Sequence, residues 1–146
     1  MTLEGVFSAA NIVAMLGWIA LVFLPGWRYT TSLITSVVIP GILGMAYTYL
    51  IVTELGRTEG GFGSLAEVTL LFQNPAALLA GWIHYLAFDL FIGSWEVRDA
   101  RSHGINHLLV VPCLFLTFMF GPIGLLLYLI LRSVSRKQLL IEASRA

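Results

Sequence analysis

Four stretches of mostly apolar residues each have about the length needed to cross a bilayer as a helix, and together they take up more than half of the chain. A helix rises about 1.5 Å per residue, so a hydrocarbon core about 30 Å thick takes about 20 residues. The stretches cover residues 6–24, 33–52, 75–95 and 107–131. We therefore predict an all-α fold, a polytopic integral membrane bundle of four transmembrane helices that forms a single domain over residues 1–146.

The composition agrees with a membrane protein and argues against other classes. Only 11% of the 146 residues are charged, whereas soluble domains have about a quarter. The formal net charge is zero, so we expect the lipid bilayer as a partner and no nucleic acid. The single cysteine, Cys113, cannot form an internal disulfide. The composition leaves the oligomeric state open.

The N-terminal residues and the basic residues predict a location and an orientation. Residues 1–8 contain no Lys or Arg, which argues against a cleaved signal peptide and favours a multi-pass protein of a bacterial inner membrane. Four crossings place both termini on one side, and the larger number of basic residues there predicts that this side is cytoplasmic. That side holds Arg57, Arg132, Arg136, Lys137 and Arg145, and the other side holds Arg28, Arg98 and Arg101.

One long connection, residues 55–74, separates the second and third apolar stretches. Its first part is rich in glycine. Ser64 and Glu67 then form a capping-box pattern in front of several apolar residues, which predicts a short helix over residues 65–72. We expect this helix to lie on the membrane interface, and a lid over a lateral entrance is the alternative.

The third stretch differs from the others because it carries ionisable residues inside the span. At about 100° per residue, His84, Asp89 and Glu96 fall within one arc of the helix, together with Tyr85. An ionisable group in hydrocarbon is costly, roughly 2.5–3.5 kcal/mol for a central Asp on insertion scales. We therefore expect this arc to face the interior of the bundle. The opposite side, which we expect to face lipid, holds Leu79, Ile83, Leu86, Ala87 and Leu90.

Three kinds of site are compatible with these residues. A histidine and a carboxylate in a cavity of low dielectric constant can exchange protons with an apolar substrate, which suits isomerisation or elimination by His84, Asp89 and Glu96. A metal site is a weaker alternative and would use Glu96, Asp99, His103 and His107. A polar contact between helices, without a ligand, is the third alternative. We expect no cofactor, because no nucleotide-binding or redox motif is present.

The segment from Trp82 to Gly93 and several later motifs resemble the abscisic-acid-deficient-four family of plastid membrane proteins and their bacterial relatives. The resemblance covers most of the chain, from the second apolar stretch to Leu131. Its motifs are Trp82-Ile83-His84, Asp89-Leu90-Phe91, His103-Gly104-Ile105, Pro112-Cys113-Leu114 and Gly121-Pro122.

This resemblance implies a small bundle of about four membrane helices and a function in carotenoid metabolism. The family is associated with forming neoxanthin from violaxanthin, in which a carotenoid 5,6-epoxide rearranges to an allenic alcohol without net redox change. For this chain it implies a carotenoid or isoprenoid isomerase, with His84, Asp89 and Glu96 as the available acid–base residues. The alternative is a non-catalytic membrane scaffold or pigment-binding partner.

Overall fold

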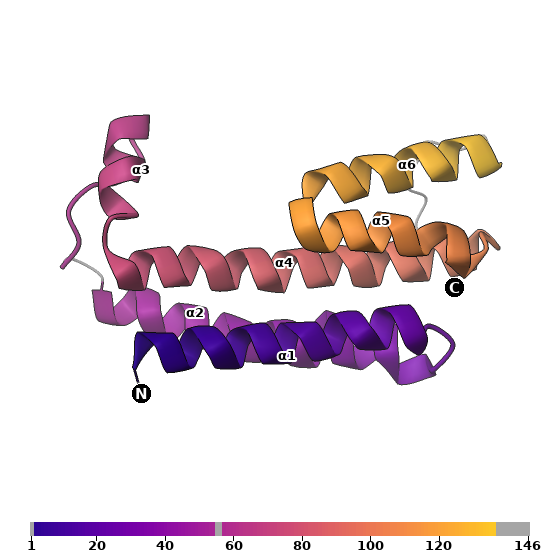
Figure 1. Cartoon of the computed structure of the whole chain (residues 1–146), viewed down its shortest axis with the longest axis horizontal. Helices are drawn as coiled ribbons and strands as arrows, with labels where there is room; N and C mark the ends of the chain where they lie inside the picture. The colour runs from indigo at the N-terminus through magenta and orange to yellow at the C-terminus, as the bar shows by residue number, and fades with distance from the viewer. Residues whose placement is uncertain (1, 55–56, 137–146) are drawn as a thin grey trace.

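The computed structural model describes residues 2–54 and 57–136, and it contains helices and no strand within these ranges. Figure 1 shows their arrangement. The helices are α1 (Leu3–Phe23), η1 (Thr30–Val38), α2 (Ile39–Glu54), α3 (Leu65–Leu71), α4 (Pro75–Ser102), α5 (His107–Phe120) and α6 (Pro122–Arg136).

The long helix α4 is the centre of the molecule. It contacts α1, η1 and α2 on one side and α5 and α6 on the other. In Figure 1, α1 and α2 run along one side of α4, whereas α5 and α6 form a hairpin against its C-terminal half. The short helix α3 stands across the end of the bundle where α2 ends and α4 begins. Both long sides of α4 are therefore covered by protein over part of their length.

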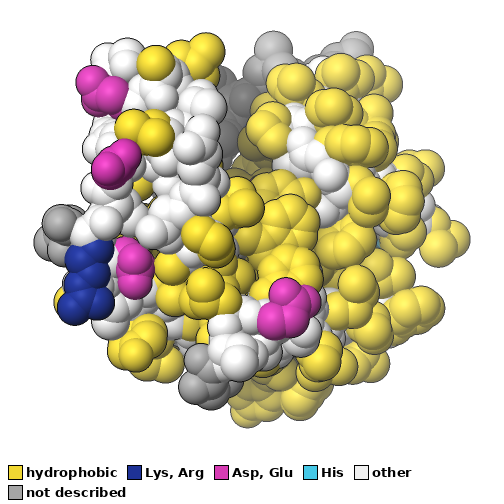
Figure 2. Space-filling model, turned by 60° about the vertical axis from the view of Figure 1, so that its left-hand side comes forward, with side chains coloured by type: hydrophobic (Ala, Val, Ile, Leu, Met, Phe, Trp, Pro, Cys, Tyr) yellow, Lys and Arg dark blue, Asp and Glu magenta, His cyan; other side chains and the backbone are white. Residues whose placement is uncertain are grey.

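The prediction of an all-helical membrane protein is confirmed. Within the described ranges, three helical segments are long and apolar enough to cross a membrane: Leu3–Phe23, Thr30–Glu54 and Pro75–Ser102. Figure 2 shows hydrophobic side chains over the centre and right of this face, whereas most of its acidic and basic side chains lie on the left. Such an apolar surface fits contact with lipid.

The predicted short helix is also confirmed as α3. The Ser64 side chain accepts a hydrogen bond from the Glu67 backbone N–H at 3.2 Å, as the capping-box pattern predicts. The Glu67 carboxylate accepts a second one from Gly63 N at 3.0 Å, which folds the preceding loop onto the helix. Whether α3 lies on the membrane interface stays a prediction.

The third stretch is longer than predicted, because α4 continues seven residues beyond residue 95 to Ser102. Asn74 caps its first turn by accepting from Ala76 N and Ala77 N, and Pro75 occupies the first turn, where a missing N–H costs nothing. The chain leaves the helix at Gly104, whose φ of 62° is in the left-handed region that favours glycine. Asp99 therefore lies within α4, near its C-terminal end.

The prediction of a fourth transmembrane helix over residues 107–131 is not confirmed. This stretch forms two helices, α5 and α6, which fold back on each other at Gly121. Gly121 has a φ of 51°, and Pro122, which lacks a backbone N–H, begins the second helix. The 14 residues of α5 span about 21 Å, which is short of the hydrocarbon core. The count of four transmembrane helices is therefore not confirmed: the described residues contain three long candidate spans and a hairpin of two shorter apolar helices.

The same finding removes the basis for placing both termini on one side. With three spans and a hairpin that turns back, the start of α1 and the end of α6 lie at opposite ends of the molecule in Figure 1. Lys137 and Arg145, which counted toward the predicted orientation, lie outside the described residues. The cytoplasmic orientation of either end stays a prediction.

The second long span begins as a π-helix, η1, directly before Pro40. Within η1 the Thr35 hydroxyl donates to the Thr30 carbonyl oxygen at 2.7 Å, and the Ser36 hydroxyl donates to the Thr31 carbonyl oxygen. The Thr35 hydroxyl also lies 3.0 Å from the Ser94 hydroxyl of α4. These buried hydroxyl contacts join η1 to α4, as small polar residues do between membrane helices.

Small residues allow the helices to approach closely. A Cβ atom on Gly93 would lie 2.7 Å from the Trp18 ring, and one on Gly124 would lie 2.0 Å from the backbone nitrogen of Thr117. The second contact is the tighter one, because a backbone atom of α5 cannot move aside as a side chain can. The α5–α6 hairpin thus depends on glycine at position 124.

We predict that Gly124→Ala destabilises the folded protein by about 1–3 kcal/mol, the range for overpacking a well-packed site. Unfolding in mixed micelles, followed by circular dichroism, measures this change. Gly41→Ala is the matched control, since a Cβ atom there meets nothing within 4 Å. Equal stability of the two variants would contradict the close contact between α5 and α6.

Candidate functional site

The structure corrects the predicted orientation of α4. The side expected to face lipid is buried against α1 and α2: its residues are Leu79, Ile83, Leu86, Ala87 and Leu90. His84, expected inside, is exposed, whereas Asp89 is half-buried and Glu96 is fully buried. About 140° of helix rotation separates His84 from Asp89, so the two side chains leave α4 in different directions. They do not form one site.

Asp89 points toward the turn of the hairpin. A Cβ atom on Gly121 would lie 3.0 Å from one Asp89 carboxylate oxygen and 3.1 Å from the other, so glycine makes room for the carboxyl group. The group therefore lies beside the N-terminal end of α6, where the helix dipole favours negative charge. One oxygen, Oδ2, is buried and has no hydrogen-bond partner among the described residues. A buried acceptor that has no hydrogen-bond partner is costly inside a membrane-spanning helix. We therefore treat Asp89 as a candidate functional group.

Tyr85 lies one turn before Asp89 and interacts with it. Its hydroxyl donates a hydrogen bond to the Phe118 carbonyl oxygen at 2.8 Å, near the end of α5. Tyr85 also lines a cavity of about 610 Å³ between the start of α1, α4 and Phe72. Tyr85 therefore links the cavity to Asp89.

The cavity beside Tyr85 is almost entirely apolar. Glu4 is the one charged residue among those that line it, and the others are Leu3, Phe7, Phe72, Pro75, Leu78, Leu79, Gly81, Trp82 and Tyr85. The Phe72 ring closes on Gly81, where a Cβ atom would lie 2.7 Å from it. This volume and lining suit one end of a large apolar molecule entering from the bilayer.

Glu96 lies two turns beyond Asp89, on the same side of α4. It is fully buried, and its Oε1 accepts a hydrogen bond from the Thr117 hydroxyl at 2.9 Å. Its Oε2 has no hydrogen-bond partner among residues 2–54 and 57–136. The predicted carboxylates Asp89 and Glu96 thus both face the hairpin, about 10 Å apart along the helix axis.

The residues of the alternative metal site are not brought together. His107 is the first residue of α5, after the turn that follows α4. Its Nε2 lies 3.0 Å from the Val22 carbonyl oxygen of α1. Glu96 is engaged by Thr117, away from Asp99 and His103. Throughout the described ranges, no three His, Cys, Asp or Glu side chains are grouped so as to hold a metal ion.

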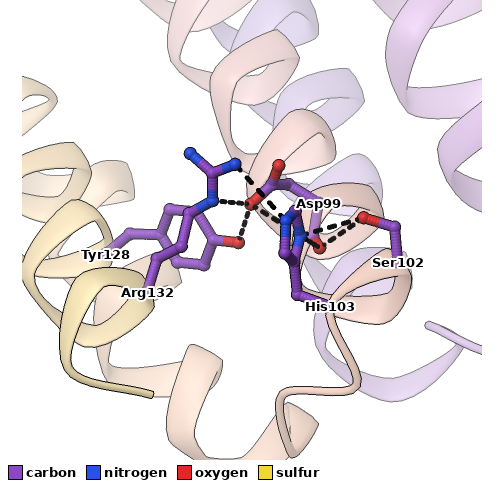
Figure 3. A network of polar contacts seen from close by, with 5 residues as sticks. All are labelled: Asp99, Ser102, His103, Tyr128 and Arg132. Carbon is purple, nitrogen blue, oxygen red and sulfur yellow. Dashed lines mark hydrogen bonds and ion pairs between the residues drawn. The ribbon is translucent and has the colours of Figure 1, made fainter. Parts of the chain in front are cut away.

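Asp99 and His103 belong instead to a network with α6 (Figure 3). The Asp99 carboxylate lies 3.0 Å from the Arg132 Nε and accepts a hydrogen bond from the Tyr128 hydroxyl at 2.6 Å. His103 lies between the two helices, with Nδ1 2.8 Å from the Asp99 carbonyl oxygen and Nε2 3.4 Å from an Arg132 nitrogen. Arg132 is 1% exposed, so this is a buried ion pair that fastens the hairpin to α4.

Sequence reasoning placed Tyr85 in the same helix arc as Asp89, but it did not identify Thr117, Tyr128 or Arg132 as parts of these contacts. The sequence does indicate that Tyr128 and Arg132 act together, because residues four apart lie on one face of a helix. Their partner could not be inferred without the hairpin, since a continuous fourth span would carry them away from Asp99.

We predict that Asp99→Ala destabilises the protein by roughly 3–5 kcal/mol, because it removes the carboxylate from a buried ion pair. Asp99→Ala with Arg132→Leu should recover much of this loss. Arg101→Ala is the control, as Arg101 is exposed and, among the described residues, donates a hydrogen bond only to the Pro25 carbonyl oxygen. Unfolding in mixed micelles checks the three variants, and a loss for Asp99→Ala no larger than for Arg101→Ala would contradict the anchoring role.

Comparison with known proteins gives one match. The family model described as ABA DEFICIENT 4-like matches residues 5–128, which run from the first turn of α1 to the middle of α6. No curated protein and no solved structure matches the sequence at the threshold of significance. The resemblance inferred from the motifs is confirmed, whereas the bacterial origin stays a prediction. Since the match covers far more than half of the residues, the chain belongs to the ABA DEFICIENT 4-like family.

Proposed function

We propose that the protein is a membrane isomerase that acts on a carotenoid or another isoprenoid and uses the acid–base residues of α4 without a cofactor. One observation carries the proposal: the unpaired carboxylate oxygen of Asp89 is buried next to Tyr85, and Tyr85 lines the large apolar cavity. Glu96 also has a buried oxygen without a partner among the described residues, but neither Glu96 nor its partner Thr117 belongs to the lining of the cavity. An open oxygen beside a ligand-sized cavity supports proton transfer.

Tyr85 would contact the ligand, and Asp89 would act behind it. In the rearrangement of an epoxide, the Tyr85 hydroxyl gives its proton to the epoxide oxygen as the carbon–oxygen bond breaks. The tyrosinate then removes the proton from the adjacent polyene carbon, which forms the new double bond and restores the hydroxyl. Asp89 positions Tyr85 and exchanges protons with it. No electron is gained or lost, so the product has the mass of the substrate.

This proposal changes the roles that the sequence predicted for His84, Asp89 and Glu96. Asp89 keeps an acid–base role. Glu96 lies two turns away and is better placed to support the hairpin through Thr117 than to touch the same ligand group. His84 opens onto another face of α4, so it is not the partner of Asp89 in this proposal.

A second function, pigment binding without chemistry, has its own support. The Tyr85 hydroxyl already donates to the Phe118 carbonyl oxygen, and the cavity offers apolar contacts to most of a ligand. A non-catalytic scaffold or pigment-binding partner would need no more than this.

We predict that expression in a carotenoid-accumulating bacterial host yields a new pigment of unchanged mass. Asp89→Asn should lower its formation by about 100-fold or more, the lower range for loss of a general acid–base group. Tyr85→Phe should do the same, and Tyr49→Phe, which alters a tyrosine on an exposed part of α2, should have no effect. Chromatography and mass spectrometry of extracted pigments measure the product.

The outcomes separate the alternatives. Full product from Asp89→Asn would overturn the assignment of Asp89. Loss of product in His84→Phe, with Tyr85→Phe active, would return the chemistry to His84. A carotenoid that co-purifies unaltered with the wild-type protein would support the binding partner instead of the isomerase.

A further inference from the structure

A second hollow lies on the side of α4 that meets α2, about 140° around the helix from Asp89. It has a volume of about 290 Å³ and is lined by Pro40, Gly44, Tyr47, Ile83, His84, Ala87, Phe88 and Phe91. No charged side chain belongs to this lining, and we call it the His84 groove. The proposed isomerase does not use it.

Two polar side chains in the His84 groove have no hydrogen-bond partner in the described part of the chain. His84 makes only ring contacts: it stacks on Phe88 with ring centroids 4.4 Å apart, and its ring lies 5.9 Å from that of Tyr47. The Tyr47 hydroxyl likewise has no bond to a described residue. His84 is the tenth residue of a 28-residue helix, so it lies about 14 Å along a helix that is long and apolar enough to cross a membrane. Lipid chains cannot satisfy either group.

The size and shape of the groove limit its occupant. A volume near 290 Å³ holds one substituted ring and not an extended polyene. The stacked His84 and Phe88 rings give it an aromatic wall. Gly44 leaves one edge open, because a Cβ atom there would meet nothing within 4 Å. A flat ring with a long apolar tail can therefore enter from the bilayer and leave its tail among the lipids.

The chemistry of the two polar groups selects the ring. The imidazole of His84 and the phenol of Tyr47 can each donate a hydrogen bond, so uncharged acceptors such as carbonyl oxygens are complementary to them. The absence of a charged residue in the lining argues against a phosphate or ammonium headgroup. We propose that the His84 groove binds the headgroup of a prenylated quinone, with His84 and Tyr47 donating to its carbonyl oxygens. The proposal concerns binding only and includes no electron transfer.

We predict that the full chain in detergent micelles binds decylubiquinone, a short-tailed quinone, in a saturable way measurable by isothermal titration calorimetry. His84→Phe keeps the aromatic contact with Phe88 but removes the donor, and it should weaken binding about tenfold. Tyr47→Phe should weaken it about fivefold, the usual effect of one hydrogen bond. Tyr49→Phe, on another face of α2, should bind as the wild type does. Decylbenzene, which has the ring and tail but no carbonyl oxygen, should bind at least tenfold more weakly.

Each result decides the proposal. Equal binding of decylubiquinone and decylbenzene would overturn it, because the groove would then be a hollow without selectivity. Unchanged binding by His84→Phe and Tyr47→Phe would also overturn it, since the quinone would lie elsewhere. The test does not depend on the proposed function: Asp89→Asn should bind decylubiquinone normally even where it forms no new pigment.

Discussion

Three carboxylates on one side of a membrane-spanning helix have to be kept away from lipid, and the α5–α6 hairpin meets this requirement. Each carboxylate faces a different part of the hairpin. Asp89 lies at its turn, Glu96 accepts from Thr117 in α5, and Asp99 pairs with Arg132 in α6. The ion pair engages Asp99 and the Thr117 hydroxyl engages Glu96 Oε1, whereas Glu96 Oε2 and Asp89 Oδ2 are buried without a hydrogen-bond partner among the described residues. The contacts that hold the hairpin in place thus also position the group that we propose for proton transfer.

Much of the fold could be predicted because lipid imposes simple rules on a sequence. The lengths of the apolar stretches located α1, the η1–α2 span and the start of α4, and local capping chemistry located α3. The break at Gly121 was missed because two short apolar helices and one long one have the same composition. A Gly-Pro pair can bend a membrane helix or end it, and only tertiary contacts, here the close approach of Gly124 to Thr117, decide between these outcomes.

The site was predicted less well, and the reason lies in how membrane proteins pack. We expected the polar side of α4 to be inside and the apolar side to face lipid. Lipid and a neighbouring helix are equally apolar, however, so hydrophobicity does not tell one from the other. Leu79 and Ile83 pack against other helices although they look suited to lipid, and His84 is exposed although it is polar. Asp89 and Glu96 could be recognised as unusual, but their partners depend on the hairpin, which the sequence pattern concealed.

The short hairpin also gives the molecule two unequal halves. The α5 helix spans about 21 Å, whereas α4 spans about 42 Å, so the hairpin accompanies only the C-terminal half of α4. A slice through that half cuts five helical segments, and a slice through the other half of the bundle cuts three. Inserted across a bilayer along the direction of α4, the described residues would occupy more area in one leaflet than in the other. Such a wedge packs with least strain in a membrane whose two leaflets differ in area, so bilayer curvature itself becomes a variable that acts on this protein.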